Sequence, residues 1–140
     1  MFILPQKIIF ILRYILALPL AVFIGYAAVI TFMGGEKLLC TLVSGIPFYC
    51  FNPYFDYIIR FVLFSSCFMA SIYHIMPAHK HLITLILGII LSSLFIGFSA
   101  FYYTESKDLL HHYSVSSCIG GIYTLIMAYQ TYKHRFRNMW

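Results

Sequence analysis

Long uncharged stretches, separated by short segments that carry the charges, dominate the pattern along this chain. Four of these stretches lack Asp, Glu, Lys and Arg over 19 to 24 residues: 14–35, 61–79, 82–104 and 109–132. A helix needs about 20 apolar residues to cross roughly 30 Å of hydrocarbon. Each stretch is therefore long enough for one transmembrane helix. We predict spans at about residues 8–33, 57–76, 82–103 and 111–132.

A fifth uncharged stretch, residues 38–55, has the length of a span but a different composition. It contains Gly45, Pro47, Asn52 and Pro53. These residues disfavour a helix and free backbone groups that lipid cannot satisfy. We therefore expect Gly34 and Gly35 to end the first helix, and residues 34–56 to form an outer loop at the membrane surface.

The composition agrees with a protein that is immersed in lipid. Hydrophobic residues make up 62% of the chain and charged residues 9%, whereas an average soluble domain is about one quarter charged. The short connections around residues 77–81 and 104–110 make successive spans antiparallel neighbours. We predict a single domain over residues 1–140, an all-α integral membrane protein with four transmembrane helices in an antiparallel bundle.

The charged residues divide unevenly between the two ends of this bundle. The N-terminal segment, the 77–81 turn and the tail hold six Lys and Arg residues and no acid, namely Lys7, Arg13, Lys80, Lys133, Arg135 and Arg137. The other two connections hold three basic residues and all four acids. Because cytoplasmic loops carry the excess of Lys and Arg, we expect both termini in the cytoplasm, with a bacterial inner membrane as the location. The net charge of +5 then reflects topology and contact with anionic lipid, and no nucleic-acid partner is expected.

Small residues recur at helical spacing within three of the predicted spans. Close approach of helix backbones through such residues holds helices together in lipid, where no hydrophobic force does so. The packing candidates are Ala21, Gly25, Gly88, Ser92, Gly97, Ser117 and Gly121. Two interpretations remain open: all of them pack the bundle internally, or one stripe, on the third helix, docks a partner subunit.

Two of the four cysteines, Cys40 and Cys50, fall in the predicted outer loop. On an oxidising side of the membrane they would form a disulfide, and the alternative is a pair of free thiols. Cys67 and Cys118 lie within predicted spans, where a cysteine behaves as a small apolar residue.

Three of the six histidines, His74, His79 and His81, gather at the inner ends of the second and third spans. They are the candidates for a metal site, but a zinc site needs a fourth ligand, and no cysteine or acid lies nearby in the sequence. Haem would require two histidines at matching depth on facing helices, and none of the histidines has such a mate. We expect neither a metal nor another cofactor.

Catalytic and transport signatures are missing from the sequence. It contains no G-x-S-x-G, no H-E-x-x-H and no phosphate-binding glycine loop, the motifs that mark common hydrolases and nucleotide enzymes. Ion-coupled carriers keep ionisable residues inside the bilayer, and no Asp or Glu falls within a predicted span. We expect a protein that is not an enzyme and whose spans hold no functional ionisable group.

These patterns favour an interaction role. The leading hypothesis is an accessory, assembly or regulatory subunit of a larger membrane complex, with the lipid bilayer and other membrane subunits as partners. The first alternative is an immunity-type protein that protects against a membrane-inserting toxin. The second is a cofactor-binding subunit of a membrane enzyme.

Overall fold

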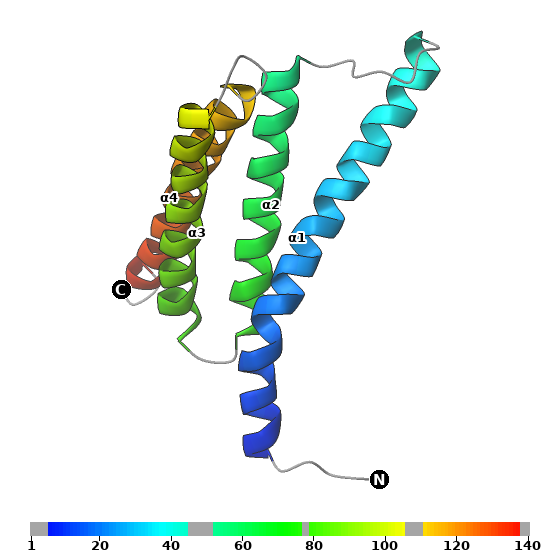
Figure 1. Ribbon diagram of the computed structural model, residues 1–140. Coiled ribbons are helices and arrows are strands. Elements are labelled where there is room, and N and C mark those ends of the chain that lie inside the picture. The colour runs from blue at the N-terminus through cyan, green and yellow to red at the C-terminus, as the bar shows by residue number, and fades with distance from the viewer. Residues whose placement is uncertain (1–5, 45–51, 77–78, 106–110, 138–140) are drawn as a thin grey trace.

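The computed structural model describes residues 6–44, 52–76, 79–105 and 111–137. These residues form four helices: α1 (Gln6–Ser44), α2 (Pro53–Ile75), α3 (Lys80–Glu105) and α4 (His111–Arg137). Successive helices run in opposite directions, so the start of α1 and the end of α4 lie at the same end of the bundle (Figure 1). The predicted all-α four-helix bundle is confirmed.

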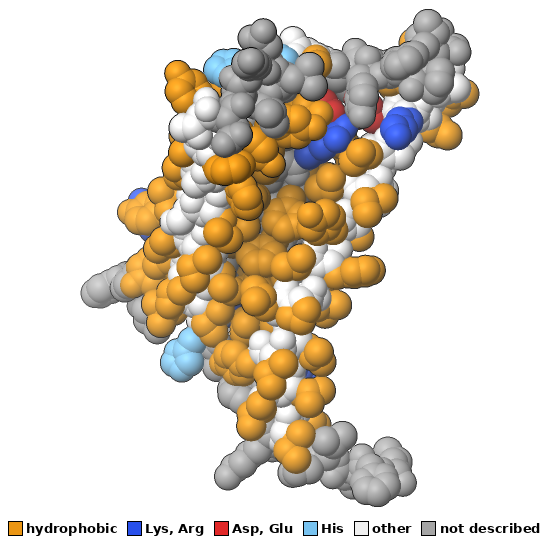
Figure 2. Space-filling model, viewed as in Figure 1, with side chains coloured by type: hydrophobic (Ala, Val, Ile, Leu, Met, Phe, Trp, Pro, Cys, Tyr) orange, Lys and Arg blue, Asp and Glu red, His pale blue; other side chains and the backbone are white. Residues whose placement is uncertain are grey.

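Three helices are long and apolar enough to cross a membrane. They are Ile11–Val43, Pro53–Ile75 and Lys80–Thr104, with mean hydropathies of 2.3, 1.6 and 2.4. Hydrophobic side chains cover the middle of the face seen in Figure 2, and most charged side chains visible there lie near its upper end. The chain is therefore an integral membrane protein whose apolar helices contact the lipid bilayer.

The fourth helix does not reach the same hydropathy among the described residues. The uncharged run 109–132 includes many Ser, Thr, Tyr and His residues, so it lacks charge without being strongly apolar. Four of the polar side chains on α4 are buried inside the bundle, namely Ser114, Ser116, Ser117 and Thr124. Composition thus supports three spans, and the fourth stays a prediction.

Helix α1 is longer than we predicted. It continues through Gly34 and Gly35 and ends at Ser44, so the predicted stop at the glycines is wrong. A glycine inside a helix costs only about 0.5–1 kcal/mol, and the residues after Gly35 include good helix formers such as Glu36 and Leu38. Residues 34–44 of the predicted outer loop 34–56 therefore belong to α1, and residues 45–51 lie outside the described part of the chain.

Helix α2 begins earlier than predicted because Asn52 and Pro53 start it. The Asn52 side chain accepts a hydrogen bond from the Tyr54 backbone N–H at 3.1 Å, and the Asn52 backbone carbonyl accepts one from the Asp56 backbone N–H at 3.1 Å. Asparagine is a preferred N-cap, and proline is favoured at the first helical position. The pair that we interpreted as a helix breaker is thus a helix start, and it places Asp56 in the first turn of α2.

The four helices do not contact one another equally. Helix α3 has its most extensive contacts with α4, and α2 packs on α4, on α1 and, less extensively, on α3. Among the described helices, the backbone of α1 comes close only to the backbone of α2. It crosses α2 near the lower end in Figure 1 and diverges from it towards the upper end.

The buried apolar core lies around the lower part of α2. Phe68, Met69 and Ile72 form its centre, and Ala17, Ala21, Met76 and Ala128 complete it from α1, the end of α2 and α4. This core does not extend to the upper part of α1, which is therefore attached to the bundle through other contacts.

Candidate functional site

Two of the predicted packing glycines lie where α3 and α4 approach each other closely. A Cβ atom added to Gly88 would lie 2.5 Å from the Cβ of Ala128, and one added to Gly121 would lie 3.0 Å from Ile96. Neither position has room for a larger side chain. The structure thus places both predicted packing glycines where neighbouring backbones come close.

Serine hydroxyls reinforce the same interface. Ser92 donates a hydrogen bond to the Gly121 carbonyl at 2.8 Å, and Ser117 donates to the Phe95 carbonyl at 2.7 Å. Ser99 and Ser114 also donate to each other's carbonyls, at 2.7 and 2.9 Å. Each of these hydroxyls thus donates a hydrogen bond to the backbone of the facing helix, and the bonds join α3 to α4.

The predicted packing residues of α1 face α2. Ala21 is fully buried in the core, and a Cβ atom added to Gly25 would lie 2.8 Å from the Phe64 ring. These residues let the middle of α1 approach α2 closely.

Gly97 is placed differently from the other packing candidates. It is exposed, and an added Cβ atom would meet nothing within 4 Å. Each helical residue turns about 100° from the last, so Ser93 and Gly97 face away from the side on which Ser92 contacts α4. An open hollow of about 360 Å³ lies on this outer face of α3, which is lined by Ser93, Leu94, Gly97, Phe98 and Phe101. We call this surface the α3 hollow.

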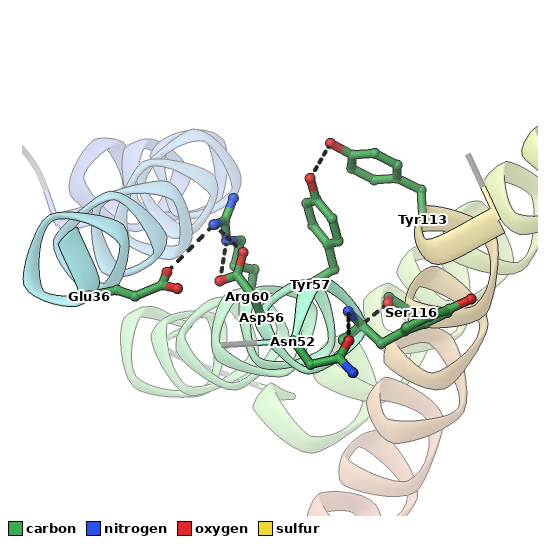
Figure 3. A network of polar contacts seen from close by, with 8 residues as sticks. Glu36, Asn52, Asp56, Tyr57, Arg60, Tyr113 and Ser116 are labelled. Carbon is green, nitrogen blue, oxygen red and sulfur yellow. Dashed lines mark hydrogen bonds and ion pairs between the residues drawn. The ribbon is translucent and has the colours of Figure 1, made fainter. Parts of the chain in front are cut away.

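A cluster of three charged side chains joins α1 to α2 near the upper end of the bundle. The Arg60 Nε–H donates a hydrogen bond to Asp56 Oδ1 at 2.9 Å, and Arg60 Nη2 contacts the second oxygen of Asp56. Arg60 Nη2 also lies 3.7 Å from Glu36 Oε2, across the gap between the helices. Figure 3 shows Arg60 between these two carboxylates. We call Glu36, Asp56 and Arg60 the charged triad.

The two carboxylates of the charged triad are buried, so the balance of charge around them is important. Glu36 is 5% exposed and Asp56 2%. With one guanidinium for two carboxylates, the formal charge of the triad is negative. Removing one partner of a buried ion pair leaves an uncompensated charge and is strongly destabilising. Arg60 is therefore the group that permits both acids to lie between the helices.

The charged triad contradicts our expectation that the carboxylates lie outside the spans. Glu36 belongs to the candidate span Ile11–Val43, and Asp56 to Pro53–Ile75. The error follows from the two wrong helix boundaries. The spacing of Asp56 and Arg60 could have predicted their ion pair, because residues four apart are neighbours on a helix surface.

An aromatic groove lies beside the charged triad, between α1 and α2. The hydroxyls of Tyr57 and Tyr113 are 2.6 Å apart, and the Arg60 guanidinium lies 5.2 Å from the centre of the Tyr57 ring. The groove has a volume of about 330 Å³, and its walls are Tyr26, Val29, Met33, Tyr57, Arg60, Phe61, Phe64, Phe95 and Tyr113. Tyr57 and Tyr113 thus connect α2 with α4.

The cysteines fall into two groups. Cys67 and Cys118 are free thiols, half-buried on α2 and α4. Cys40 is fully buried on α1, whereas Cys50 lies outside the described residues. The Cys40–Cys50 disulfide therefore stays a prediction.

The histidine candidates do not converge on one point. Within the described residues, no three His, Cys, Asp or Glu side chains are arranged to hold a metal ion, and this applies to His74, His79 and His81. His81 instead places its Nδ1 3.0 Å from the Thr131 carbonyl, which ties the start of α3 to α4.

Comparisons of the chain with models of protein families, with curated proteins and with solved structures found no match. Its function is therefore inferred from the surfaces and side chains described above.

Proposed function

We propose that this chain is a non-catalytic accessory, assembly or regulatory subunit of a larger membrane complex, and that it docks through the α3 hollow. The observation that supports this most is Gly97. It lies on an apolar helix, with Ser93 one turn before it, and no described residue fills the space beside it. Small residues at this spacing let a second helix approach closely in lipid. Gly88, on the same helix, serves such an approach within the chain.

The test is co-purification from native membranes with a mild detergent, using the Gly97→Leu variant. We expect the wild-type chain to carry its partner and the variant to lose it while keeping the wild-type thermal stability. Gly35→Leu is the matched control, because Gly35 is another helical glycine with nothing within 4 Å of an added Cβ. A wild-type chain that runs alone as a monomer at native expression would refute the proposal, and so would retention of the partner by Gly97→Leu.

We further propose that α4 is the fourth span, and that both ends of the chain face the cytoplasm across a bacterial inner membrane. The common end of α1 and α4 in Figure 1 supports this orientation, as do the six Lys and Arg residues without an acid in the segments at that end. Protease access to a short tag at each terminus, compared in right-side-out and inside-out vesicles, checks it. Both tags should be cleaved only in inside-out vesicles, and cleavage from opposite faces would contradict the orientation.

A further inference from the structure

A second groove lies at the opposite end of the bundle from the charged triad, between α2 and α4. It has a volume of about 340 Å³. Ser66, Met69, Ala70 and Met127 line the part nearer the middle of the helices, and Tyr73, His74, His81 and Thr131 line the part nearer their ends. A mostly apolar groove with two histidines at one end suits an amphiphilic ligand.

Three basic side chains surround the Tyr73 ring at the mouth of this groove. The Lys80 Nζ lies 4.5 Å from the ring centre, and the ring centres of His81 and His74 lie 5.2 and 5.7 Å from it. The Thr131 carbonyl can only accept a hydrogen bond, so His81 Nδ1 carries the proton in that contact. His81 is thereby held in a fixed orientation beside the groove.

The charge at this end is of one sign. The two described acidic side chains, Glu36 and Asp56, form their ion pairs with Arg60 at the other end of α2. None of the described acids lies near Lys80, and Lys133 on α4 adds a further exposed cation. Basic pockets between transmembrane helices attract anionic lipid headgroups.

We propose that this groove binds one anionic phospholipid, with an acyl chain along Met69, Ala70 and Met127 and the phosphate against Lys80. The charge selects the headgroup, and the apolar side chains of the groove select a lipid over a free anion. The site is separate from the α3 hollow, so it does not depend on the proposed partner subunit.

Native mass spectrometry of the purified full-length chain tests the proposal, with phosphatidylglycerol and phosphatidylcholine of identical acyl chains as the probes. We expect phosphatidylglycerol to bind at least about fivefold more tightly, which is the effect of roughly one lysine near a phosphate. Lys80→Gln should remove most of this preference. Lys37→Gln, which changes an exposed lysine at the other end of the bundle, should leave it unchanged.

A second variant tests the groove without changing charge. Ala70 is exposed and lines the groove, so Ala70→Phe should fill it and weaken binding of phosphatidylglycerol severalfold. Ala100→Phe, at an exposed alanine on α3 outside the groove, is its control. Thermal melts of all four variants identify any that fail to fold.

Several results would overturn the proposal. One is equal binding of the two lipids by the wild-type chain, and another is an equal loss in Lys80→Gln and Lys37→Gln. Unchanged binding in a folded Ala70→Phe would exclude the acyl-chain groove. Displacement of phosphatidylglycerol by millimolar inorganic phosphate would show that the cluster binds a free anion instead of a lipid.

Discussion

Helix α3 lies along α4 through glycines and serines that touch the facing backbone, whereas the upper part of α1 meets α2 through a long, charged side chain. Between α3 and α4, an added Cβ on Gly121 would lie 3.1 Å from the Ser92 carbonyl oxygen. Between α1 and α2, Arg60 reaches Glu36 at 3.7 Å where the two helices diverge. Close packing tolerates little change in side-chain volume, and a buried ion pair tolerates little change in charge. The two regions should therefore respond to different substitutions.

The largest effect is expected from Arg60→Met, which leaves Glu36 and Asp56 without their shared cation. Losing one partner of a buried ion pair costs about 3–5 kcal/mol, and Arg60 is partly accessible, with 15% of its side chain exposed, so the loss should fall towards the lower figure. Reversible unfolding in mixed micelles measures it. Lys37→Met, at an exposed lysine on α1, is the control, and equal stabilities of the two variants would show that the triad does not hold α1.

A smaller effect is expected where the packing is tight. Gly88→Leu must displace Ala128 and Met69, and overfilling a packed interior costs about 1–3 kcal/mol. Gly97→Leu, on the same helix but with open space beside it, should leave the free energy of unfolding of the isolated chain unchanged. The same unfolding assay compares the two, and a loss at Gly97 as large as that at Gly88 would reverse the assignment of the two faces of α3.

The smallest effect is expected from single hydroxyls. Ser92→Ala removes a hydrogen bond to another helix, which inside a membrane protein contributes about 0.6 kcal/mol on average. Ser93→Ala removes only a bond to the Ile89 carbonyl in its own helix and should be nearly silent. The difference in unfolding free energy between these adjacent substitutions isolates the bond between α3 and α4, and a larger loss at Ser93 would contradict it.

The number, type and direction of the helices could be predicted from the sequence because they depend on long-range composition. The lengths of the uncharged stretches predicted four helices, and α3 and α4 begin within two residues of the predicted positions. The helix boundaries near residues 34–56 depend on local chemistry that the composition conceals. Glycines in α1 did not end the helix, and Asn52 with Pro53 began one.

The candidate sites were predicted less well, for physical reasons that particular residues show. Glu36 and Asp56 are far apart in sequence, and only the tertiary packing of α1 on α2 brings them to one arginine. Gly97 and Gly121 look alike as small residues, but the rotation of each helix decides which one faces a neighbour. Tyr73, Lys80 and His81 come together because the start of α3 lies beside the end of α2.

The attachment of α1 to the bundle through the charged triad is tested most directly by a distance measurement in lipid nanodiscs. Spin labels on two exposed residues, Leu39 of α1 and Phe55 of α2, report the separation of the upper helix ends. The wild-type chain should give one narrow distance distribution, which broadens and shifts to longer distances in Arg60→Met and stays unchanged in Lys37→Met. A broad wild-type distribution, or one that Arg60→Met leaves unaltered, would contradict the account.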